Sequence, residues 1–173
     1  MRKFSDEEKQ QRAFLRVARI MHEWWDESEG VYCDTRILLD PFIPNKYVEY
    51  GKSINVSNDS KYHREHIVPR KCICDQCFKM FEDKVSIEEA AEFIQRYLKI
   101  IFISKDEQKR LDGNQKNGGT GLKQKMPDEM PLESSNMFAR LTVTKIEFTP
   151  FDHTINCICS SCVNDRKPGP KSS

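Results

Sequence analysis

The sequence has almost no net charge, no long apolar run and, apart from one repeated cysteine pattern, no internal repeat. Its 28 lysines and arginines are almost cancelled by 27 aspartates and glutamates, so no whole-molecule field draws the protein to DNA or to an anionic membrane. No apolar run approaches the roughly 20 residues that a membrane-spanning helix needs, and the charged N-terminus contains no signal-peptide core. We therefore expect a cytoplasmic, intracellular protein that does not bind membranes.

The composition indicates a folded protein of modest size. The chain has 173 residues, of which 38% are hydrophobic and 32% are charged, which is enough for one domain with a core of its own. We expect a single zinc-stabilised α+β domain over residues 1–165. The polar segment 166–173, rich in lysine, proline and serine, has no side chains that could form a packed core, so we expect a disordered tail.

Capping signals and apolar spacing predict the main elements. Ser5 and Glu8 form a capping box ahead of a helix over residues 6–25, and Ser86 and Glu89 form another ahead of a helix over residues 87–97. Glycines and prolines predict a long loop over residues 112–133. The other expected elements are a hairpin of strands 47–50 and 53–56, helices over 70–83 and 104–111, and strands over 98–103 and 141–146.

Cysteine is the most informative residue type. Seven cysteines are an odd number, which argues against a secreted disulfide framework and favours metal ligation. Cys33 stands apart from the others. Six cysteines lie in two copies of a C-x-C-x-x-C pattern, namely Cys72, Cys74 and Cys77 in the first and Cys157, Cys159 and Cys162 in the second.

The two patterns together predict a structural zinc site. A Cys-x-x-Cys pair brings two thiolates to one ion, so Cys74 and Cys77 with Cys159 and Cys162 complete a tetrahedral four-thiolate set. Cys72 and Cys157 are open to three interpretations: extra ligands, bridging thiolates of a two-metal cluster, or packing groups. The alternative for all of these cysteines is that they are free and buried.

The stretch from residue 61 to residue 77 is the most chemically dense part of the chain. It carries His63, Glu65 and His66 just ahead of the first cysteine pattern. Glu65-His66-Ile-Val-Pro69, following an expected hairpin, resembles the opening of the HNH, or ββα-metal, nuclease motif. The resemblance implies a hairpin-helix element around one divalent ion, with His66 as the base that deprotonates water and Glu65 as a ligand of Mg²⁺ or Mn²⁺.

The match to the HNH pattern is partial. The family places an Asn and a second, metal-binding His soon after the base, and neither lies between Pro69 and Leu98. The nearest substitutes are Asn114, Asn117 and His153. His63 and His153 are candidate metal ligands. The alternatives are that the histidines are packing or surface residues, or that His63 or His66 ligates zinc beside the thiolates.

Basic residues surround this stretch. In a nuclease, Arg64, Arg70 and Lys71 would contact nucleic-acid phosphates, whereas in a protein of another kind they form a solvated face. The sequence thus leads to two hypotheses. The first is a metal-dependent HNH-type endonuclease acting on DNA, with the small size of the chain suggesting a phage or mobile-element setting. The second is a non-catalytic zinc-binding module that recognises nucleic acid or a protein partner.

Overall fold

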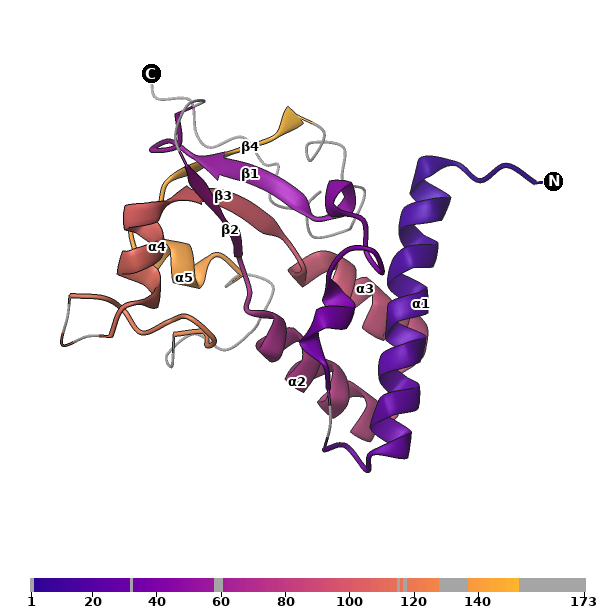
Figure 1. Cartoon of the computed structure of the whole chain (residues 1–173). Helices are drawn as coiled ribbons and strands as arrows, with labels where there is room; N and C mark the ends of the chain where they lie inside the picture. The colour runs from indigo at the N-terminus through magenta and orange to yellow at the C-terminus, as the bar shows by residue number, and fades with distance from the viewer. Residues whose placement is uncertain are drawn as a thin grey trace, which may run out of the picture.

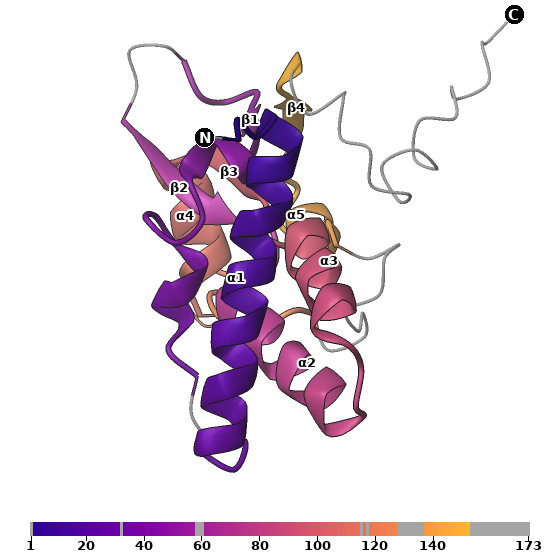
Figure 2. The same ribbon diagram turned by 90° about the vertical axis from the view of Figure 1, so that its right-hand side faces the viewer.

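The computed structural model describes residues 2–31, 33–57, 61–114, 116, 118–127 and 137–152. These residues form an α+β fold around a mixed sheet with the strand order β2-β3-β1-β4. Helices α1, α2 and α3 pack against one another beyond one end of the sheet, while α4 and α5 lie beside it (Figures 1 and 2). The strands are β1 (Glu49–Ser53), β2 (Tyr62–His66), β3 (Ile100–Ser104) and β4 (Phe148–Pro150). The α-helices are α1 (Asp6–Glu27), α2 (Arg70–Glu82), α3 (Ile87–Tyr97), α4 (Lys105–Asp112) and α5 (Ala139–Val143), with 3₁₀ turns at Thr35–Leu38 and Asn45–Tyr47.

The two predicted capping boxes begin the helices α1 and α3. In α1, the Ser5 hydroxyl accepts a hydrogen bond from the Glu8 amide, and the Glu8 carboxylate accepts one from the Ser5 amide. The predicted bounds of α3 are confirmed, and α1 extends two residues beyond its prediction. The apolar side of α1 packs on α3, so the periodicity identified a real core-facing surface.

The predicted hairpin over residues 47–56 is wrong. Gly51 and Lys52, expected to form its turn, lie inside β1, which pairs in parallel with β3 and antiparallel with β4. A Cβ atom on Gly51 would lie only 2.4 Å from the Thr149 carbonyl oxygen. Glycine is therefore needed here for the close approach of β4 rather than for a turn. Strand β2 pairs antiparallel with β3, which follows it in the chain.

The predicted strand over residues 141–146 is also wrong, because this segment begins within α5. Its β-branched residues favour a strand locally. In the fold, however, a helical turn buries both Arg140 and Leu141, and Lys145 then takes a positive φ of 53° that ends the helix. The expected tail, residues 166–173, and residues 153–165 lie outside the described part of the chain. None of the described helices combines the length and apolar character that a membrane crossing requires.

A buried carboxylate joins β1 to the start of α4. Glu107 is 1% exposed, and its Oε1 accepts hydrogen bonds from Ser53 Oγ at 2.7 Å and Asn55 Nδ2 at 2.9 Å. Its Oε2 accepts one from the Ser104 amide at 2.8 Å. Burial by itself raises the pKa of Glu107, but the hydrogen bonds from Asn55, Ser53 and Ser104 outweigh it and hold the pKa below its ordinary value.

Glu107→Gln is expected to lower the free energy of unfolding by about 1–3 kcal/mol, because its amide group leaves one buried donor without an acceptor. The pKa of Glu107 is lowered in the folded state, so its stabilising effect is present above the unfolded pKa and is lost as the pH falls through the folded value. Urea titrations at neutral and acidic pH measure both effects. Glu89→Gln, which changes the carboxylate that accepts from Ser86 in the exposed capping box of α3, is the matched control and should have a smaller effect. Equal effects of the two variants would contradict the role assigned to Glu107.

Candidate active site

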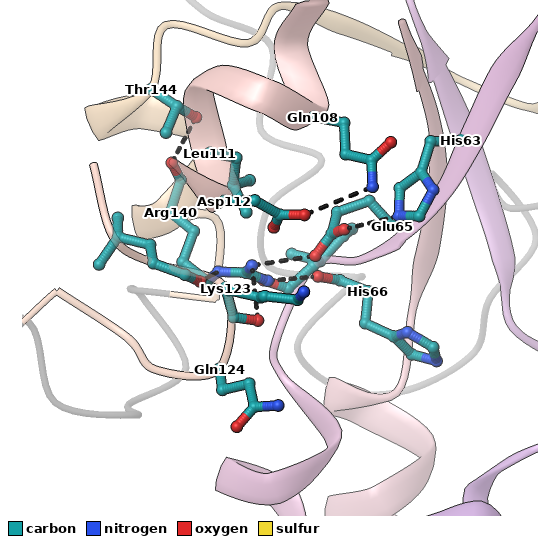
Figure 3. A network of polar contacts seen from close by, with 12 residues as sticks. His63, Glu65, His66, Gln108, Leu111, Asp112, Lys123, Gln124, Arg140 and Thr144 are labelled. Atoms are coloured by element: carbon teal, nitrogen blue, oxygen red, sulfur yellow. Dashed lines mark hydrogen bonds and ion pairs between the residues drawn. The ribbon is translucent and has the colours of Figure 1, made fainter. Parts of the chain in front are cut away.

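A fully buried arginine lies at the centre of the polar network in Figure 3. Arg140 of α5 is 0% exposed. Its Nε donates to the Leu122 carbonyl at 2.9 Å, and its Nη1 donates to the His66 carbonyl at 2.6 Å. Its Nη2 donates to Glu65 Oε1 at 2.9 Å. Since a buried guanidinium needs its donors paired, these bonds fix α5 and the loop before it against β2.

Glu65 of β2 contacts both a cation and an imidazole. Its side chain is 10% exposed; Oε1 accepts from Arg140, and Oε2 lies 3.3 Å from His63 Nε2. Burial raises the pKa of Glu65, although the charges of Arg140 and His63 act in the opposite direction. The nearby Asp112 carboxylate raises the pKa further. Arg140 thus binds the Glu65 carboxylate in a buried environment that disfavours the charged form of that carboxylate.

Strand alternation places His63 and Glu65 on the same face of the sheet, towards α4. The His63 side chain is 31% exposed, so the imidazole is reached by solvent while one of its nitrogens faces Glu65. Gln108 and Asp112 of α4 lie beside this pair, with Gln108 Nε2 donating to Asp112 Oδ2 at 3.3 Å. The exposed Lys123 comes from the loop before α5. Together these side chains form a half-open polar site.

His66 lies differently from His63. Its side chain points away from Glu65 in Figure 3, and its Nε2 is buried without a hydrogen-bond partner among the described residues. Burial lowers the pKa of His66 to about 3, and the charges of Arg70, Arg64 and Arg140 act in the same direction. An imidazole in this position stays neutral but is a weak base, and its Nε2 has no access to solvent. The geometry does not fit the water-activating role that the HNH resemblance implies for His66.

The second HNH role, a divalent ion on Glu65, does not fit these contacts either. Both carboxylate oxygens of Glu65 are engaged, one by Arg140 and the other by His63, and an ion at either oxygen would displace one of these partners. Within the described ranges, no three His, Cys, Asp or Glu side chains are placed to hold a metal ion. Of the substitutes considered from sequence, Asn117 and His153 lie outside the described residues.

The first cysteine pattern lies on α2, not on a tight turn. Cys74 and Cys77 are buried on one side of the helix, with exposed fractions of 1% and 0%. Cys72 is half-buried, and its sulfur lies 3.7 Å from the Gln124 carbonyl oxygen. Cys157, Cys159 and Cys162 lie outside the described residues, so the four-thiolate site stays a prediction.

Cys33 lies outside both cysteine patterns in the sequence, but in the fold it contacts Cys74 of the first pattern. A hydrogen bond joins its thiol to that of Cys74. This bond and burial both raise the pKa of Cys74. At Cys33 burial acts to raise the pKa, but the bond to Cys74 outweighs it and lowers the pKa. Burial also raises the pKa of Cys77. Without a metal ion, the Cys74 and Cys77 thiols therefore stay protonated.

The basic residues singled out from sequence make separate contacts. Arg64 lies 3.5 Å from Glu49, Arg70 donates to the Thr35 carbonyl, and Lys71 pairs with Asp75 of its own helix. Each of the three thus has a partner of its own within the protein.

Comparison with protein-family models, with curated proteins and with solved structures gave no match. The function proposed for the candidate site therefore rests on the geometry of its residues.

Sequence reasoning found Glu65 and His63 but missed the residues that surround them. Arg140 sits between apolar neighbours in the segment Met137 to Leu141, and a charged residue in an apolar segment is the one signal that could have indicated a buried partner for Glu65. Gln108, Asp112 and Lys123 carry no such signal. They lie far from β2 in sequence and meet it only in the fold.

Proposed function

We propose that the protein is a nuclease that hydrolyses phosphodiester bonds in DNA, with His63 rather than His66 as the general base. This assignment is supported by the contact between His63 and Glu65. The His63 imidazole is partly exposed to solvent, and its Nε2 lies 3.3 Å from Oε2 of the largely buried Glu65 carboxylate. This is the arrangement in which a carboxylate orients an imidazole for proton transfer.

The roles follow from the two nitrogens of His63. With Nε2 directed at Glu65, Nδ1 is the nitrogen that accepts a proton from water. The water oxygen then bonds to phosphorus as the ester oxygen leaves. Glu65 stabilises the imidazolium that forms, and Arg140 acts as a positioning residue because it holds Glu65 from the buried side. The exposed Lys123 supplies a cation beside the site for the phosphate.

Nicking of supercoiled plasmid tests this proposal, with Mg²⁺, Mn²⁺ or a chelator in separate reactions. The wild-type protein is expected to nick the plasmid, and His63→Ala is expected to remove the activity. An absence of cleavage under every condition would overturn the nuclease proposal. Cleavage that survives in His63→Ala but not in His66→Gln would return the role of the base to His66.

The second candidate function is a non-catalytic, zinc-stabilised module that binds nucleic acid or a protein. It is favoured by the full engagement of the Glu65 carboxylate, which is typical of a structural ion pair, and by the adjacent buried thiols of Cys74 and Cys77. These two thiols fit half of a tetrahedral zinc site, with the second cysteine pattern supplying the other half. Such a zinc ion would stabilise the fold and leave no open position for water.

Metal analysis of the purified protein tests the zinc site. We expect about one zinc ion per chain, and we expect Cys74→Ala and Cys77→Ala each to reduce that content severalfold, because each removes one of four ligands. Cys72→Ala is the matched control and should retain the zinc, since its thiol is directed at the Gln124 carbonyl. A zinc-free wild-type protein would contradict the site, and zinc loss in Cys72→Ala would place that residue among the ligands.

A further inference from the structure

The sheet face opposite His63 and Glu65 carries a group of aromatic and basic side chains. In the strand register, Phe102 of β3 is paired with Arg64 of β2 on one side and with Lys52 of β1 on the other, so these three residues share a face. The Tyr62 and Phe102 rings meet edge to face with their centroids 5.0 Å apart. Phe151, just after β4, lies 5.9 Å from Phe102 on its other side.

This face is hollowed and open. Lys52, Val56, Ser57, Tyr62 and Phe102 line a hollow of about 180 Å³. The Tyr62 side chain is 54% exposed and Phe102 is partly exposed. We call this surface the aromatic hollow. Helices α4 and α5 belong to the other face, with Glu65 and Arg140, so the aromatic hollow is separate from the candidate active site.

The charges next to the aromatic hollow are mainly positive. Lys52 lines it, and Lys61, directly before Tyr62 in the chain, is exposed. Arg64, farther along β2, is paired with Glu49 at 3.5 Å. Glu49 and the exposed Asp152, next to Phe151, are opposing charges among the described residues. An exposed ring flanked by lysines offers a stacking surface together with partners for phosphate.

We propose that the aromatic hollow binds single-stranded nucleic acid, with a base stacked on the rings of Tyr62 and Phe102 and the backbone phosphates at Lys52 and Lys61. Bases of a single strand are free to stack on an aromatic side chain, whereas bases in a duplex are stacked on one another. The combination of rings and cations therefore selects the single strand.

The position of β2 connects this surface to the candidate active site. In the described sheet β2 is an edge strand, and its consecutive residues Tyr62 and His63 face opposite sides. A strand bound across Tyr62 can pass over this edge towards His63. In this respect the inference rests on the proposed function, because it names single-stranded nucleic acid as the substrate class. Binding itself does not depend on cleavage.

Fluorescence anisotropy with a labelled oligothymidylate tests the inference, with full-length His63→Ala protein used so that the probe stays intact. We expect binding of the single strand and weaker binding of a duplex of equal length. Tyr62→Leu and Phe102→Leu are each expected to weaken binding by about 5- to 100-fold, since each removes a stacking ring but keeps an apolar side chain. Lys52→Ala is expected to reduce the salt dependence of binding.

Phe42→Leu is the matched control, because Phe42 is an exposed aromatic residue, 42% exposed, that does not line the aromatic hollow. It should bind as the parent protein does. The inference is overturned if the single strand does not bind, if the duplex binds more tightly, or if Tyr62→Leu binds as Phe42→Leu does. Binding that depends on Tyr62 in a protein that never cleaves would support the inference and reject the nuclease proposal.

Discussion

Replacing Arg140 with methionine is expected to lower the free energy of unfolding by about 3–5 kcal/mol, the usual cost of removing one partner of a buried ion pair. Methionine fills part of the volume but donates no hydrogen bond. The carboxylate of Glu65 then loses its cation, and the carbonyls of Leu122 and His66 lose their donor. The loss of partners for buried groups, more than the loss of attraction, produces the effect.

The destabilisation by Arg140→Met should depend on pH in a defined direction. The pKa of Glu65 is raised in the folded protein, so its contribution to stability is present below the unfolded pKa and is lost as the pH rises through the folded value. Without Arg140, the pKa of Glu65 rises further. The stability difference between wild type and variant is therefore expected to be smaller under acidic conditions, where the Glu65 carboxyl is protonated in both proteins, and to grow towards neutral pH. The part due to the Leu122 and His66 carbonyls remains at every pH.

Urea denaturation of wild type and variants measures this effect. Arg110→Met is the matched control, because Arg110 is exposed and donates from Nε to the Thr144 carbonyl at 3.1 Å; it should cost less than about 1 kcal/mol. The double replacement Arg140→Met with Glu65→Leu should be less destabilised than the sum of the single changes. A loss in Arg140→Met no larger than that in Arg110→Met would contradict the central place of Arg140.

Replacing His63 with alanine is expected to reduce the rate of phosphodiester cleavage by about 10²–10⁴-fold, the usual contribution of a general base. The His63 side chain is partly exposed, so the variant should keep most of its stability. The rate measured with saturating DNA separates this chemical effect from a loss of binding, which would change the half-saturating concentration instead.

His22→Gln serves as the control for a histidine outside the site. His22 of α1 contacts the rings of Trp25 and Phe81, with centroids 5.6 and 5.0 Å away, and its replacement should leave the cleavage rate unchanged. Glu65→Gln is expected to slow cleavage as well, because glutamine retains the size of the side chain but not the charge that stabilises an imidazolium. Unchanged cleavage by His63→Ala would reject His63 as the base.

Local signals predicted the helices well. The bounds of α3 were confirmed because Ser86 and Glu89 satisfy free amides at the helix start, and this requires only residues three positions apart. The same reasoning identified the start of α1. The segment over residues 98–103 was correctly expected to form a central strand, although β3 begins two residues later, at Ile100.

The strand pairing could not be predicted in this way. Gly51 reads as a turn residue in isolation, but its role comes from the Thr149 backbone almost a hundred residues later in the chain. Likewise, residues 141–146 are rich in β-branched side chains that favour a strand. The chain nevertheless forms a helical turn at their start, where Arg140 is buried against Glu65 of β2. Both errors arise because partners distant in sequence outweigh local propensity.

The sequence by itself determined the α+β character, the capped helices and the chemically dense segment with His63, Glu65 and His66. Only the tertiary structure decided which histidine is open. Alternation along β2 directs His63 towards the site with Glu65, while His66 is turned away and its Nε2 is buried. The contacts of Arg140 with Glu65 and of Cys33 with Cys74 also arise only in the tertiary structure. The physical reason is that helix caps and strand alternation act between near neighbours, whereas the burial of a charge is set by residues that meet only when the chain has folded.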